Sequence, residues 1–146
     1  MRIYLDSCSI QRPLDTKSHV RILVEAEAVL GILALCETGK LELVSSDALV
    51  FETERIPYPV RKQYALEVLS QAKIFVRTDE QIEERARLFL SLGIKPLDAL
   101  HLASAEAAQV DYFCTSDDRF LRRARAVADI RTRAVSPLEL VAEVAQ

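Results

Sequence analysis

The segment RIYLD, residues 2–6, is a short apolar run that ends in an aspartate. A similar run, DYFCT, occupies residues 111–115. Both have the length of a strand, and their continuous apolar character is typical of strands buried on both faces of a sheet. With three further runs, the expected strands cover residues 2–6, 41–45, 74–77, 111–115 and 130–134. This pattern predicts an α/β fold with a mostly parallel sheet of four to five strands.

Segments with helical spacing of apolar residues lie between these runs. The first extends from about residue 20 to Gly39, a typical C-terminal stop. Pro59 and Pro96 predict two helix starts, because proline fits the first turn of a helix. Asp79 is expected to cap a helix that ends near Gly93, and a last helix begins at residues 136–137. No repeat or linker interrupts the chain, so we expect one domain over residues 1–146.

The composition excludes several function classes. The 146 residues carry a formal charge of −3, which does not favour a polybasic binder. Three scattered glycines cannot form a phosphate-cradling loop, so no nucleotide cofactor is expected. Three cysteines without a C-x-x-C motif predict neither a zinc cluster nor a disulfide framework. The absence of a signal segment or a long apolar run predicts a cytoplasmic protein with no membrane span.

Four carboxylates follow the predicted strands or begin the predicted helices. Asp6 ends the first strand and Asp117 follows the fourth, so a parallel sheet places both at its carboxyl edge, where ligands bind in open α/β sheets. Asp98 lies in the first turn of its helix, and Glu52 lies in the segment after the second strand. Oxygen-rich clusters of this kind select Mg²⁺ or Mn²⁺.

Each carboxylate also has a purely structural interpretation. Asp98 is favourable near a helix N-terminus, and Asp117 or Asp118 can cap the helix that follows them. Glu52 alone is typical of a solvated helix face. For Asp6 a functional role is favoured, because an ionised carboxylate beside a buried strand is costly unless it is paired or bound to a metal.

Four segments, in this order and spacing, resemble the PIN-domain family: IYLDS at residues 3–7, SSDALVFE at 45–52, PLDALHLASA at 96–105 and YFCTSDDRFL at 112–121. Proteins of this family are Mg²⁺- or Mn²⁺-dependent ribonucleases with a three-layer α/β/α fold. The chain is most similar to the toxin half of a VapBC-type toxin–antitoxin pair. The resemblance therefore implies RNA as the substrate, a cognate antitoxin and a homodimer.

The resemblance also implies roles for individual residues. It assigns catalysis and metal binding to Asp6, Glu52, Asp98 and Asp117. Asp118 is a candidate substitute in the fourth position, and Glu54 ranks behind Glu52 because it points to another helix face. Ser7, Thr115 and Ser116 are implied to support the site. Cys8 departs from the family, in which many relatives have Asn or another small residue.

The expected mechanism needs no covalent nucleophile, since a metal-bound water attacks the phosphate. His101 is three residues from Asp98 and therefore near the site. A buried packing histidine is the favoured interpretation, and a site residue is the alternative. Positive charge follows Asp117, where Arg119, Arg122 and Arg123 are candidates for contact with RNA phosphates or an acidic antitoxin. A solvated helix face is the alternative for these arginines. Aromatic residues at 6% do not favour binding by base stacking.

The first long helix is apolar around most of its circumference, which predicts a dimer interface or an antitoxin groove there. Three function classes remain open. The toxin ribonuclease is favoured, a PIN-like nuclease of RNA processing is the alternative, and a catalytically weak PIN-like binding domain is a further one. A receiver-like or phosphatase-like domain is disfavoured, because no lysine stands at the end of a predicted strand.

Overall fold

The computed structural model describes residues 1–145, in which five parallel strands form one sheet with the order β3-β2-β1-β4-β5. The strands are β1 (Arg2–Leu5), β2 (Glu42–Ser46), β3 (Ile74–Val76), β4 (Tyr112–Cys114) and β5 (Arg133–Val135). Every neighbouring pair is parallel, which confirms the predicted fold class. The central strand is β1, and it pairs with β2 on one side and β4 on the other.

The last predicted strand was misplaced along the chain. It was expected over residues 130–134, whereas β5 begins at Arg133 and runs to Val135. The register explains the shift, because Arg133 pairs with Tyr112 at the start of β4. Ile130 instead lies in a turn in which its N–H donates to the carbonyl of Val127.

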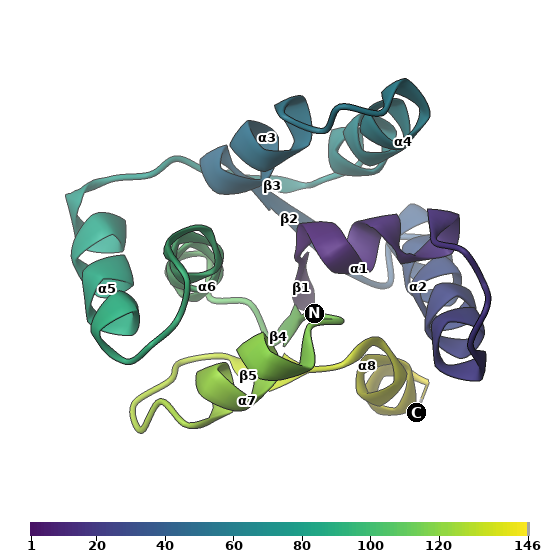
Figure 1. The fold of residues 1–146 in the computed structure, drawn as a ribbon. Helices are drawn as coiled ribbons and strands as arrows, with labels where there is room; N and C mark the ends of the chain where they lie inside the picture. Colours follow the sequence, from purple (N-terminus) through teal and green to yellow (C-terminus); the bar gives the residue numbers. More distant parts are fainter. Residues whose placement is uncertain (146) are drawn as a thin grey trace.

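Helices cover both faces of the sheet. In Figure 1, α5 and α6 lie on one side of the strands, and α2 and α8 lie on the other. The helices are α1 (Ser7–Gln11), α2 (Val20–Glu37), α3 (Asp47–Glu54), α4 (Pro59–Ser70), α5 (Glu80–Ser91), α6 (Pro96–Ala107), α7 (Asp118–Arg125) and α8 (Pro137–Val144), with a 3₁₀ turn at Arg12–Leu14. The predicted starts at Pro59, Pro96 and Pro137 are confirmed, whereas the five-residue α1 was not predicted.

Polar residues at strand ends start the next helices by capping them. Asp6 follows β1, Ser46 ends β2, and Asp117 lies three residues after β4. The side chain of each accepts at least one hydrogen bond from a backbone N–H in the first turn of the next helix. These caps satisfy donors that have no partner within the helix. They also fix three sharp strand-to-helix turns at the carboxyl edge of the sheet.

The core is built around the two central strands. Tyr4 of β1 and Phe113 of β4 are fully buried, and their rings stack with centroids 5.3 Å apart. Phe120 of α7 packs edge-on against Phe113 at 5.4 Å. The aromatic cluster therefore joins the sheet to the helix that begins at Asp117.

None of the helices within residues 1–145 is long and apolar enough to cross a membrane.

The two strand phenylalanines offer a test of this packing. Phe113→Ala should lower the free energy of unfolding by about 3–5 kcal/mol, because it removes a fully buried ring and leaves a cavity. Phe75→Ala on the edge strand β3 is the matched control, and it should cost less than about 1 kcal/mol because Phe75 is 49% exposed. Urea denaturation of both variants measures the difference, and equal losses would contradict this account of the core.

Candidate functional site

A pocket of about 320 Å³ opens at the carboxyl edge of the sheet, and all four predicted carboxylates line it. Its walls come from the ends of β1 and β4 and from the helices α3 and α6. The lining residues are Asp6, Ser7, Cys8, Glu52, Lys95, Leu97, Asp98, His101 and Asp117. Residues up to 111 positions apart in the sequence therefore meet at one place.

Asp6 is the most buried of the four carboxylates, with 4% of its surface exposed. Its Oδ1 accepts hydrogen bonds from the N–H of Ser9 and the thiol of Cys8, both at 3.1 Å. Burial raises the pKa of Asp6, and hydrogen bonds from Thr115 and Cys8 oppose this shift. A carboxylate in this position is costly when it is charged and unpaired, so it gains from a bound cation.

The surroundings of Asp98 disfavour its ionised form. It lies in the first turn of α6 and is half-buried. Burial raises its pKa to about 6, with further contributions from the negative charges of Asp6, Asp117 and Glu52. This repulsion shows that the four carboxylates act on one another electrostatically.

Glu52 projects from α3 and contacts His101 of α6. His101 is 1% exposed, as expected for a packing residue, but its Nε2 lies 3.0 Å from Oε1 of Glu52. Its Nδ1 lies 2.7 Å from the hydroxyl of Tyr4. His101 is therefore buried in the core and also contacts a carboxylate of the candidate site. Tyr4 was missed, because only the tertiary structure brings its hydroxyl to α6.

Asp117 combines the two roles that the sequence left open. Its Oδ1 caps α7 by accepting hydrogen bonds from the N–H groups of Arg119 and Phe120, while the residue also lines the pocket. Its own N–H donates to Oγ1 of the buried Thr115 at 3.1 Å. Thr115 thus contacts Asp117, and its hydroxyl lowers the pKa of Asp6, so it lies beside two of the four carboxylates.

Three of the candidate residues lie away from the pocket. Asp118 is exposed and forms a two-pronged ion pair with Arg21 of α2, at 2.6 and 2.8 Å, which lowers its pKa. The hydroxyl of Ser116 contacts that of Ser9 at 3.3 Å rather than a carboxylate of the site. Glu54 is exposed and does not line the pocket. Asp118 and Ser116 therefore do not line the pocket, and the ranking of Glu52 above Glu54 agrees with the geometry.

Positive side chains stand beside the carboxylates. Arg119 and Arg123, one turn apart on α7, line a small adjoining pocket with Lys95 and with two of the carboxylates, Asp98 and Asp117. Arg123 also donates to the carbonyl oxygen of Gly93. Arg122 is exposed but lines neither pocket, so the predicted three-arginine face is reduced to two. Lys95 was missed as a site residue, although it directly precedes the helix start at Pro96.

The donor set fits a hard divalent cation. Oxygen ligands from two or more carboxylates, with room for water, are what Mg²⁺ and Mn²⁺ require. Within residues 1–145, no group of three or more His, Cys, Asp or Glu side chains is already arranged to hold a metal ion. The carboxylates instead surround a common pocket and repel one another, and a cation would relieve this repulsion.

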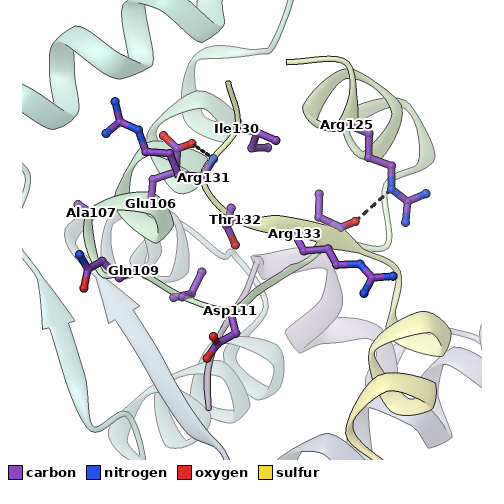
Figure 2. A pocket seen from close by; sticks show the side chains of 11 residues that line it. Glu106, Ala107, Gln109, Asp111, Arg125, Ile130, Arg131, Thr132 and Arg133 are labelled. Carbon is purple, nitrogen blue, oxygen red and sulfur yellow. Dashed lines mark hydrogen bonds between the residues drawn. The ribbon is translucent and has the colours of Figure 1, made fainter. Parts of the chain in front are cut away.

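A larger pocket, of about 1100 Å³, opens where β4 and β5 begin, at the opposite edge of the sheet (Figure 2). Most of its charged side chains are already engaged, and the guanidinium of Arg131 is the exception among the described residues. Arg125 bonds to the carbonyl of Ala134 and to Glu139, Arg133 pairs with Glu143, and Glu106 accepts from the N–H of Arg131. The carboxyl-edge pocket therefore remains the candidate functional site.

Comparisons with known proteins identify the family and the fold of the chain. A family model described as the PIN domain matches residues 3–126, and no curated protein matches the chain. Among solved structures, PAE2754 from Pyrobaculum aerophilum is 15% identical with a TM-score of 0.59, covering 99% of this chain and 96% of that one. VapBC2 from Rickettsia felis, bound to a DNA fragment from its promoter, is 13% identical with a TM-score of 0.61, covering 93% and 98%. At these identities the structures show a shared fold.

Burial and charge repulsion at Asp98 predict a pH-dependent gain in stability for Asp98→Asn in EDTA. The raised pKa means that the folded protein holds this proton more tightly than the unfolded chain does. Ionisation of Asp98 therefore costs stability as the pH rises from about 4 to above 6. Allowing for partial exposure to solvent, the variant should gain about 1 kcal/mol at pH 7.5 and nothing near pH 4.

Thermal unfolding at both pH values measures this effect. Glu27→Gln removes an exposed carboxylate from α2 and serves as the control, with little expected change at either pH. An Asp98→Asn variant less stable than the wild type at pH 7.5 would contradict the repulsion.

Proposed function

Because this chain belongs to the PIN-domain family, whose members are generally nucleases, we propose that it is a Mg²⁺- or Mn²⁺-dependent endoribonuclease that acts in the cytoplasm. We further propose that it is the toxin of a VapBC-type toxin–antitoxin pair. The observation that carries the proposal is the convergence of Asp6, Glu52, Asp98 and Asp117 on one pocket with a basic rim.

Asp6, Asp98 and Asp117 would hold the cation, and Glu52 would contribute directly or through a water molecule. When bound, the ion lowers the pKa of a water ligand and stabilises the charge that develops on the scissile phosphate. The four carboxylates supply only oxygen donors, so the pocket discriminates against softer ions.

The residues of the chain hold this donor set in place. Cys8 and Ser9 fix Oδ1 of Asp6, and the cap on α7 fixes Oδ1 of Asp117. His101 engages Oε1 of Glu52, which leaves Oε2 to accept a proton or a hydrogen bond from the attacking water. This orientation matters, because a water molecule must be directed at the phosphate for attack.

The basic rim supports a nucleic-acid substrate. Lys95, Arg119 and Arg123 lie beside Asp98 and Asp117, where the phosphates on either side of the scissile bond would pass. Phosphate contacts of this kind dominate nucleic-acid affinity and offset the repulsion between the carboxylates and the RNA backbone. RNA, rather than DNA, is the substrate that the family resemblance favours.

The surface of α2 and α4 supports an antitoxin partner. Val20, Leu23 and Leu30 of α2 are exposed, with Val20 77% exposed, and Val60 of α4 is exposed as well. A groove of about 280 Å³ runs between the two helices. Exposed apolar surface of this kind marks an interaction site. We assign it to the antitoxin, and the homodimer implied by the resemblance remains a second proposal, to be tested by light scattering.

The paired glutamates of α3 test the proposed chemistry. Glu52→Gln should reduce RNA cleavage in Mn²⁺ by about 100-fold, because it removes the charge that holds the ion or the water. Glu54→Gln is the matched control, which should cleave within about twofold of the wild type because Glu54 is exposed outside the pocket. Cleavage that persists in EDTA, or equal activities of the two variants, would reject the mechanism.

The groove predicts a separation of antitoxin binding from catalysis. The proposed antitoxin should bind Leu30→Glu at least about tenfold more weakly, since the variant replaces an apolar side chain of the groove with a third carboxylate beside Glu37 and Glu67. RNA cleavage by this variant should be unchanged. Leu92→Glu, at an exposed position after α5, is the control for a new surface charge. Full binding of Leu30→Glu would place the antitoxin elsewhere.

A further inference from the structure

A chain of buried hydrogen bonds leads from the core to Glu52. The hydroxyl of Tyr4 lies 2.7 Å from Oγ of Ser46 and 2.7 Å from Nδ1 of His101, whose Nε2 lies 3.0 Å from Oε1 of Glu52. Ser46, Tyr4 and His101 are each no more than 1% exposed. The chain joins the end of β2, the centre of β1 and the middle of α6 to the one site carboxylate carried by α3.

Counting donors and acceptors gives the chain a direction. Ser46 Oγ already accepts the N–H of Leu49 as the cap of α3, so its own proton is free to point at Tyr4. Tyr4 then donates to Nδ1 of His101, which leaves the proton of the imidazole on Nε2, facing Glu52. Every donor in this arrangement meets an acceptor, and the carboxylate receives the last bond.

We propose that Ser46, Tyr4 and His101 are positioning residues that hold Glu52 in the orientation needed for divalent-cation binding and phosphodiester hydrolysis. This inference rests on the proposed function for its consequence in catalysis. Its physical basis is that a hydrogen bond to the second nitrogen of an imidazole fixes both its tautomer and its ring orientation. Because the imidazole of His101 cannot rotate, its hydrogen bond holds the side chain of Glu52 in a single rotamer.

The alternative is that Tyr4 and His101 only fill the core. The Tyr4 ring stacks on Phe113, and a phenylalanine would preserve that packing. A packing role therefore predicts that loss of the hydroxyl has no effect on Glu52, whereas a positioning role predicts a changed imidazole tautomer and a weaker cation site.

Tyr4→Phe and Tyr112→Phe form the matched pair for the experiment. Each removes one strand hydroxyl, but Tyr112 bonds to Glu143, away from the site. In ¹H–¹⁵N spectra, His101 should occupy the Nε2–H tautomer in the wild type and in Tyr112→Phe, and a mixture of tautomers in Tyr4→Phe. Titration calorimetry should show Mn²⁺ affinity about tenfold lower for Tyr4→Phe than for the control.

A second pair of variants, at His101, keeps the proposal testable if a variant of the first pair fails to fold. The amide nitrogen of His101→Gln can donate to Glu52 from nearly the position of Nε2, whereas the shorter side chain of His101→Asn cannot. The Gln variant should keep Mn²⁺ affinity within about threefold of the wild type, and the Asn variant should lose about tenfold or more.

An unchanged tautomer and equal Mn²⁺ affinities in Tyr4→Phe and Tyr112→Phe would overturn the positioning role. Both measurements are made without RNA, which separates the two proposals. A wild-type protein that binds Mn²⁺ but cleaves no RNA would overturn the proposed function, while the tyrosine pair would still decide whether Tyr4 and His101 orient Glu52.

Discussion

The parallel pairing of β1 with β4 is the constraint on which the site depends. Leu5 pairs with Cys114, and the N–H of Asp6 continues the ladder by donating to the carbonyl of Cys114 at 3.1 Å. Because the two strands run in the same direction, the residues after them emerge at the same edge. Asp6 and Asp117 are therefore brought together by backbone hydrogen bonds, and the remaining carboxylates are added to this edge by α3 and α6.

The fold could be predicted because most of its strands and helices have local signals in the sequence. Continuous apolar runs located four strands and the approximate position of the fifth, and a proline or a capping residue marked the starts of α4, α5 and α6. These signals are local, since burial, fixed φ and capping all act within a few residues. The misplacement of β5 has the opposite cause, because its register depends on the pairing of Arg133 with Tyr112 across the sheet.

The carboxylates of the site could be predicted from the sequence, but the hydrogen bonds and ion pairs that surround them could not. Asp6, Glu52, Asp98 and Asp117 could be located from strand ends and from the resemblance, and all four line the pocket. Asp118, adjacent to Asp117, was a candidate substitute, but its side chain pairs with Arg21, 97 residues away, which local spacing could not indicate. The link from Tyr4 through His101 to Glu52 was missed for the same reason, since hydrogen bonds between distant elements leave no mark in local spacing.

The structural and functional interpretations of a carboxylate are not exclusive in this protein. Asp6 and Asp117 each use Oδ1 to cap a helix, and both still line the pocket. A cap holds the side chain in one rotamer, which is also what a cation ligand requires. Asp98 accepts no such hydrogen bond among the described residues. Burial and the negative charges of its neighbours raise its pKa, so its ionised form is disfavoured. The caps thus supply rigidity, the repulsion would favour binding of the proposed cation, and the buried aromatic core stabilises the fold that carries both.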